Sequence, residues 1–160
     1  GAMFRFMPRR HLIFCAAALL LTLPYQSLSR QDAWFGTWSL NLENAESPVY
    51  KRVVTRIEPW EEGLRVTYDM VGVRGGVTHM EWMGKFDGRD YPMQGVDYVM
   101  TNAYRRIDNQ SYEIVIKIDG VTTATARVVV SPDGRKLSVV TAERSSIGHA
   151  KTTTATYQKL

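Results

Sequence analysis

The stretch Leu64-Arg65-Val66-Thr67-Tyr68-Asp69-Met70 decides the fold class, because apolar and polar residues alternate through it without a break. A period of two puts its apolar side chains on one face of a β-strand and its polar side chains on the other. The same alternation recurs in residues 112–118, Tyr-Glu-Ile-Val-Ile-Lys-Ile. Both segments are therefore predicted to be strands with one buried face.

Turn signals separate further strands at short intervals along the chain. Glycine and asparagine supply the positive φ angles that tight hairpins need. The signals are Glu62-Gly63, Arg74-Gly75-Gly76, Asp87-Gly88, Asp108-Asn109, Asp119-Gly120 and Pro132-Asp133-Gly134. The predicted strands cover residues near 36–42, 51–58, 64–73, 78–87, 97–101, 103–107, 111–119, 122–131, 136–145 and 151–159. Pro92 and Gly95 predict a bulge, a lid or a broken strand in the region of residues 94–102.

Short strands joined by hairpins predict an all-β protein, and we expect a single antiparallel up-and-down β-barrel of about eight to ten strands. Closure of the sheet removes the edges that would otherwise recruit other chains. After the N-terminal segment no helix of ordinary length competes with the strands, although residues 30–35 have room for one helical turn.

The N-terminal segment is predicted to lie outside the barrel. Gly1 and Ala2 have the form of a tag remnant, which places the natural start at Met3. A basic stretch, the apolar residues 12–23 and the small residues of Ser27-Leu28-Ser29 then follow in the order of a secretory leader. The apolar stretch is shorter than the roughly 20 residues that span a bilayer.

These features predict a tag remnant plus signal peptide over 1–29 and a barrel domain over 30–160. The barrel is accordingly expected to be exported, periplasmic or secreted, with no stable membrane span after cleavage. The alternative is a structural or membrane-attached N-terminal helix. Cys15, the single cysteine, lies in the leader, so the barrel domain is expected to have no disulfide.

Charge gives little support for nucleic-acid binding. The formal net charge is +4, but the leader carries three of the 20 Lys and Arg residues and none of the 16 Asp and Glu residues. The remaining 17 basic residues nearly balance the 16 acidic ones, so the barrel lacks the basic excess typical of nucleic-acid partners.

Gly36-Thr37-Trp38 resembles the Gly-x-Trp signature of lipocalins and related barrels. In that family the tryptophan closes the narrow end, often beneath a basic side chain of the last strand. The resemblance implies a barrel-closing motif of Gly36 and Trp38, with Lys159 or Lys151 as the covering cation. A wider set resembles small secreted bacterial lipocalin-like proteins: Gly36–Asn41, Thr78-His79, Phe86–Pro92 and Arg106–Asp108. That resemblance implies an exported barrel related to lipocalins and fatty-acid-binding proteins, and no reaction.

Signatures of metal, cofactor and nucleophilic chemistry are missing from the sequence of the barrel domain. It contains His79 and His149 as its only histidines and no cysteine, and it has no Gly-x-Ser-x-Gly elbow, phosphate-binding loop or dinucleotide fingerprint. The sequence therefore predicts neither a metal site nor a cofactor, and it favours a binding protein over an enzyme.

A small apolar or amphipathic molecule in the barrel interior is the predicted partner. On neighbouring strands, methionine and aromatic side chains occupy alternate positions, and small residues lie between them. This arrangement favours a pocket whose shape can adapt to its ligand. In such a pocket Tyr104 and Arg106 would orient an acidic head group, and fatty-acid-binding relatives use a comparable Arg-x-Tyr pair. The favoured alternative is an exposed arginine paired with a nearby acid. The predicted ligand-binding residues are Tyr68, Met70, Met80, Trp82, Phe86, Tyr104 and Arg106.

Two other functions remain open at this stage. One is an enzyme of the isomerase or cyclase type that uses Tyr68, Tyr104 or His79 as an acid–base group inside the cavity. The other is an envelope scaffold that recognises a protein through the loops 94–102 or 145–149. A barrel filled with its own side chains is the alternative to any cavity.

Overall fold

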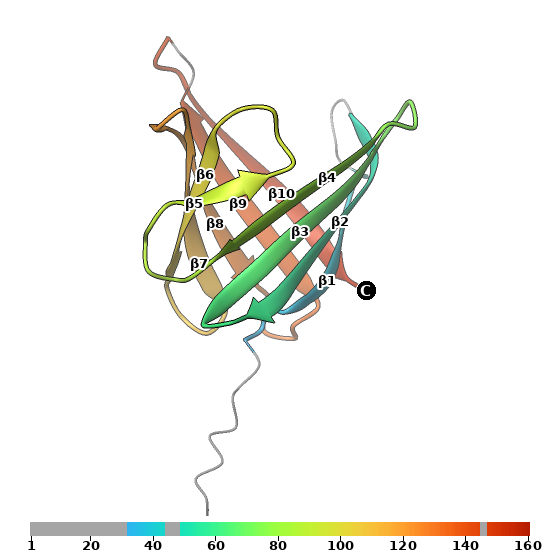
Figure 1. Ribbon diagram of the computed structural model, residues 1–160. Coiled ribbons are helices and arrows are strands. Elements are labelled where there is room, and N and C mark those ends of the chain that lie inside the picture. The colour runs from blue at the N-terminus through green and yellow to red at the C-terminus, as the bar shows by residue number, and fades with distance from the viewer. Residues whose placement is uncertain (1–31, 44–48, 145–146) are drawn as a thin grey trace, which may run out of the picture. The chain divides into compact units, whose positions relative to one another are not determined.

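Ten β-strands make up most of the residues that the computed structural model describes, which are 32–43, 49–144 and 147–160. They are β1 (Gly36–Leu40), β2 (Tyr50–Trp60), β3 (Gly63–Gly72), β4 (Val77–Gly84), β5 (Tyr91–Gln94), β6 (Met100–Arg106), β7 (Ser111–Ile118), β8 (Val121–Val130), β9 (Lys136–Arg144) and β10 (Ala150–Lys159). All ten belong to one unit, Gln31–Leu160. Figure 1 shows them wound around a common interior, with connecting loops at both ends.

The sheet closes on itself because the first strand pairs with the last. Each strand pairs antiparallel with its neighbour in the chain, and β1 also pairs with β10. The closing register sets Trp38 opposite Lys159 and Leu40 opposite Tyr157. Every described strand thus has a partner on both sides, which confirms the predicted antiparallel up-and-down barrel.

The middle of the chain differs from the prediction. The predicted strands 97–101 and 103–107 are wrong, because residues 100–106 form one continuous strand, β6. Asn102 lies at the predicted break, since strands disfavour asparagine, but here its backbone pairs with Ile116 and its side chain is buried in the interior.

β5 was not predicted as a strand of its own, because it contains Pro92. This strand has four residues and pairs through only two of them on each side. Pro92 takes part in the pairing with β6 and not in the pairing with β4. A proline is tolerated in such a short strand because few ladder hydrogen bonds depend on it.

The fourth strand is shorter than the predicted 78–87, since β4 ends at Gly84. A side chain at Gly63 would lie 1.9 Å from the Gly84 carbonyl oxygen, so the two backbones approach closely where β3 begins and β4 ends. Phe86 consequently lies in the loop after β4. Its ring packs against Trp34 and Tyr112, with centroid distances of 5.4 and 5.5 Å.

Two buried tryptophans close the end of the barrel where the chain enters it. Trp34 and Trp38 are fully buried, and the Trp38 indole N–H donates a hydrogen bond to the Trp34 carbonyl oxygen at 2.9 Å. The Lys159 ammonium lies 5.4 Å from the centre of the Trp38 ring, which confirms Lys159 as the covering cation. Gly36 has a φ of 147°, and a side chain there would meet Lys159 Cε at 2.9 Å, so the glycine makes room for this lysine.

Several sequence predictions concern residues outside the described ranges. The tag remnant and the leader over 1–29, with Cys15 inside it, are among them. So are Ser145 and Ser146, at the end of the predicted strand 136–145 and in the loop 145–149.

The approach of β3 to β4 makes Gly63 a test of the barrel's packing. We expect Gly63→Ala to lower the free energy of unfolding by about 1–3 kcal/mol, because the added methyl group forces two backbones apart. Urea unfolding measures the change. Gly76→Ala is the matched control, because nothing lies within 4 Å of its added methyl group, and it should change stability by less than about 0.5 kcal/mol. Equal effects of the two substitutions would contradict the packing described here.

Candidate functional site: a cavity inside the barrel

The barrel encloses a cavity of about 190 Å³, so its own side chains do not fill it completely. All ten strands contribute at least one lining residue. Most of the wall is apolar: Trp38, Ile57, Val66, Met80, Met93, Met100, Ile114, Ile116, Ala126, Val128, Leu137 and Val139. Thr55, Tyr68, Asn102, Tyr112, Thr141 and Tyr157 supply the polar part of the lining.

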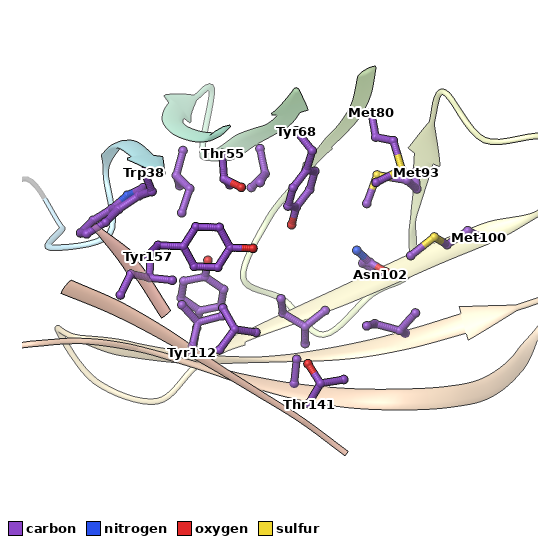
Figure 2. Close-up of a pocket in the computed structure, with 18 residues that line it drawn as sticks. Trp38, Thr55, Tyr68, Met80, Met93, Met100, Asn102, Tyr112, Thr141 and Tyr157 are labelled. Atoms are coloured by element: carbon purple, nitrogen blue, oxygen red, sulfur yellow. The ribbon is translucent and has the colours of Figure 1, made fainter. Parts of the chain in front are cut away.

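Trp38 closes one end of the cavity, and Met80, Met93 and Met100 surround the other end, which we call the methionine rim. Figure 2 shows Trp38 at one end and the sulfur atoms of Met80, Met93 and Met100 gathered at the other. Trp38 is fully buried, whereas Met80 and Met100 are partly exposed. The lining therefore becomes more accessible toward the methionines, which places the approach from solvent at that end.

Hydroxyl groups project into the space between these ends. In Figure 2 the phenol oxygens of Tyr68 and Tyr157 point toward the middle of the cavity, with Thr55 and Asn102 nearby. Thr55 and Asn102 are only 7% and 3% exposed. The Thr55 hydroxyl and the Asn102 side-chain oxygen make no hydrogen bond with any described residue, and neither does the buried Tyr104 hydroxyl.

Burial keeps the phenols of this region protonated. It raises the pKa of Tyr68 to about 12, and the nearby Tyr157 phenol adds to this effect. Burial likewise raises the pKa values of Tyr104 and Tyr112 well above the ordinary value, with further contributions from neighbouring tyrosines, and it raises that of Tyr157. Thr55 lies close enough to Tyr157 to offset part of that rise, although the two hydroxyls do not meet hydrogen-bond geometry. At neutral pH these groups are hydrogen-bond donors without charge.

Two of the predicted ligand-binding residues line the cavity, namely Tyr68 and Met80. Trp82 and Tyr104 are buried in the core and do not line the cavity; they form a stacked pair with ring centroids 3.9 Å apart and planes 14° from parallel. Phe86 packs against the same buried core. Met70 is buried on β3, two residues beyond Tyr68.

Trp82 holds the irregular part of the wall together. Its indole N–H is shared between the carbonyl oxygens of Tyr91 and Asn102, at 3.1 and 3.2 Å. The side chain therefore links β4 to β5 and β6, where the strand pairing is shortest. Its position makes it a support for the wall that carries Met93 and Asn102.

Arg106 lies away from the cavity lining, at the tryptophan end of the barrel. Its guanidinium group donates a hydrogen bond to Asp32 at 2.6 Å and lies 5.1 Å from the centre of the Trp34 ring. Arg106 is thus an exposed arginine paired with an acid, as the sequence favoured, and neither it nor Tyr104 lines the cavity.

His79 lies on the outer face of β4. Its side chain is 56% exposed and contacts the Asp69 carboxylate at 2.7 Å, while Glu81 is 4.0 Å away. Tyr68, on the neighbouring strand, faces inward instead. Of the three acid–base candidates of the sequence, only Tyr68 lines the cavity.

Several lining residues have no clear signal in the sequence. Tyr157 follows a run of threonines in β10, and Asn102 lies where a strand break was predicted, so neither belongs to a clear apolar alternation. One signal was present: Thr153, Ala155 and Tyr157 occupy alternate positions, a spacing that places small side chains and one phenol on the same strand face.

Within residues 32–43, 49–144 and 147–160, no three or more His, Cys, Asp or Glu residues gather into a group able to hold a metal ion. In the same ranges there is no helix with the length and apolar character to cross a membrane. No protein-family model and no curated protein matches this chain.

The raised pKa of Tyr68 predicts how stability changes in alkali. Between pH 10 and 12 an unfolded chain releases the phenol proton while the folded chain retains it, so the free energy of unfolding falls as the pH rises. The fall due to this residue should approach about 1.4 kcal/mol per pH unit. Urea unfolding across this range should show a shallower decline for Tyr68→Phe than for the unsubstituted protein. Tyr98→Phe, at an exposed tyrosine, should leave the slope unchanged. Equal slopes in all three proteins would contradict the burial of Tyr68.

Proposed function

We propose that this protein is an exported binding barrel that takes one small apolar or amphipathic molecule into its interior. The observation that carries the proposal is the largely apolar cavity of about 190 Å³ between Trp38 and the three methionines. Sites for small molecules combine such apolar walls with a few placed polar groups. The methionine rim suits a guest of irregular shape, because methionine adapts its side chain to its surroundings.

The loops at the methionine end support this route of entry. Large apolar side chains are exposed there next to the strand ends: Val49, Val73, Val77, Tyr98, Val99, Val121 and Ile147. An apolar guest that approaches the cavity would thus meet apolar surface before it reaches Met80 and Met100.

Binding fits the described cavity better than catalysis does. Its lining contains no carboxylate, histidine, lysine or arginine side chain. The phenols of Tyr68 and Tyr157 are weak acids with raised pKa values, which makes them donors rather than general bases near neutral pH. An isomerase or cyclase would therefore have to work with phenol and amide groups alone.

A substitution that fills the cavity tests the binding proposal. Val139 lines the cavity, and the next residue, Val140, is exposed on the outside of the same strand. We expect toluene to bind the unsubstituted protein and to raise its midpoint of thermal unfolding. Val139→Phe should weaken toluene binding at least about tenfold, since the added ring occupies the guest's space, and Val140→Phe should leave it unchanged. Failure of toluene to bind, or equal binding by both variants, would refute the proposal.

Export is tested separately, through processing of the chain. The leader predicts that protein recovered from the cell envelope or medium begins at Arg30, which an intact mass measurement determines. Leu20→Arg should retain the unprocessed chain in the cytoplasm because it interrupts the apolar stretch, whereas Leu20→Ile should be processed normally. A chain that keeps residues 3–29 outside the cytoplasm would contradict cleavage and favour an N-terminal anchor.

A further inference from the structure

Buried polar atoms without partners indicate what kind of guest the cavity is made for. Thr55 Oγ1 and Asn102 Oδ1 both belong to the lining and make no hydrogen bond with a described residue. Most buried polar groups in folded proteins are paired, so each exception calls for an explanation. A purely hydrocarbon guest would seal these atoms away from water and leave them unpaired.

The phenols of the wall add donors next to these atoms. Figure 2 shows the Tyr68 and Tyr157 hydroxyls directed into the same part of the cavity as Thr55 and Asn102. Each hydroxyl can donate one hydrogen bond to a guest oxygen, whereas the Asn102 side-chain oxygen is an acceptor and does not contribute to holding a carbonyl. The polar part of the lining is thus suited to a carbonyl group in the middle of the cavity.

The same wall is unsuited to an anion. None of the cavity-lining residues is basic. Arg106, the cation considered for an acidic head group, is bound to Asp32 outside the lining. A carboxylate would therefore lose its hydration without gaining an opposite charge, and burial without such a partner is strongly unfavourable.

The cavity volume limits the size of the guest. A protein cavity of about 150 Å³ holds one benzene molecule, and the cavity described here measures about 190 Å³. The space is enough for one ring with a small substituent. It is too small for the long chain of a typical fatty acid.

Resting on the proposed binding function, we propose that the cavity selects uncharged, ring-sized molecules that carry a carbonyl acceptor, which the hydroxyl groups of Tyr157, Tyr68 and Thr55 hold. The substrate class is that of small neutral ketones, quinones and related carbonyl compounds. Acids of the same shape are excluded. The selective element is the set of uncharged donors, and the apolar wall supplies general affinity.

Three probes with the same number of non-hydrogen atoms separate the effect of the carbonyl group from that of the apolar wall and from that of a charge. Acetophenone carries the carbonyl, α-methylstyrene replaces its oxygen with a CH₂ group, and benzoate replaces its methyl group with a charged oxygen. Titrations of the ¹⁵N-labelled full chain at neutral pH, followed through the Trp38 indole and Asn102 amide signals, give the three dissociation constants. We expect both neutral probes to bind and benzoate to bind at least about a hundredfold more weakly than acetophenone.

Substitutions then assign the selectivity to the hydroxyl groups. Tyr157→Phe should raise the dissociation constant of acetophenone about five- to tenfold, the effect of losing one hydrogen bond, and should not weaken α-methylstyrene. Thr55→Val provides a second variant with the same expectation should the first fail to fold. Tyr98→Phe, which removes a hydroxyl from the exposed loop, should change neither probe.

The outcomes distinguish this inference from the binding function on which it rests. Benzoate that binds as tightly as acetophenone, or a Tyr157→Phe substitution that weakens both neutral probes equally, would overturn the selection for a neutral carbonyl and leave binding intact. Failure of every probe to bind the unsubstituted protein would overturn both. Ordered water that stays between the probe and the hydroxyl groups of Tyr157, Tyr68 and Thr55 in a structure of the acetophenone complex would also overturn the proposed carbonyl contacts.

Discussion

The pairing of β1 with β10 is the constraint on which the rest of the structure depends. β1 has only five residues, and its register with β10 joins Trp38 to Lys159 and Leu40 to Tyr157. The first pair places a cation over the indole that closes the barrel. The second fixes the backbone next to a phenol that lines the cavity. Without this pairing, β1 and β10 would present unpaired edges, and the cavity would lose two adjoining parts of its wall.

The chemistry of the cavity follows from a division of charge between the two sides of the barrel wall. Charged side chains pair with one another on the outer surface, as Arg65 does with Glu58 and Lys117 with Asp90. The inner surface carries hydroxyl and amide groups instead, and burial keeps the phenols neutral. In a medium of low polarity such groups favour an uncharged guest, because a charge would have no compensating partner.

Alternation along the strands was sufficient to predict the barrel, because each strand buries one face and every hairpin leaves a glycine or asparagine signal. The prediction was wrong where a single polar or cyclic residue interrupts the pattern. Because strands disfavour asparagine, Asn102 led to a prediction of two strands where β6 is one. Because strands also disfavour proline, Pro92 led to no strand being predicted at β5. Both residues are accommodated by tertiary packing, which a local pattern does not contain. Trp82, whose indole N–H bonds to backbone oxygens on β5 and β6, is the contact that holds this region in place.

The candidate site was less accessible to sequence analysis than the fold was. Tyr68 and Met80 could be selected because they lie on strongly alternating strands. Arg106 pairs with Asp32 and lies over Trp34 near the end of β6, which agrees with the exposed, acid-paired arginine that the sequence favoured over a head-group contact. Whether an inward-facing residue reaches the cavity depends on its height along the barrel axis. Strand pairing and shear determine that height, and periodicity alone does not. Different parts of the inner wall have different roles. Stacked aromatic rings on β4, β6 and β7 make it rigid, whereas the smaller side chains of Ala126, Val139 and Thr141 leave free space in the cavity. Substitutions on β8 and β9 can therefore change the shape of the cavity while the stacked rings keep the barrel wall in place.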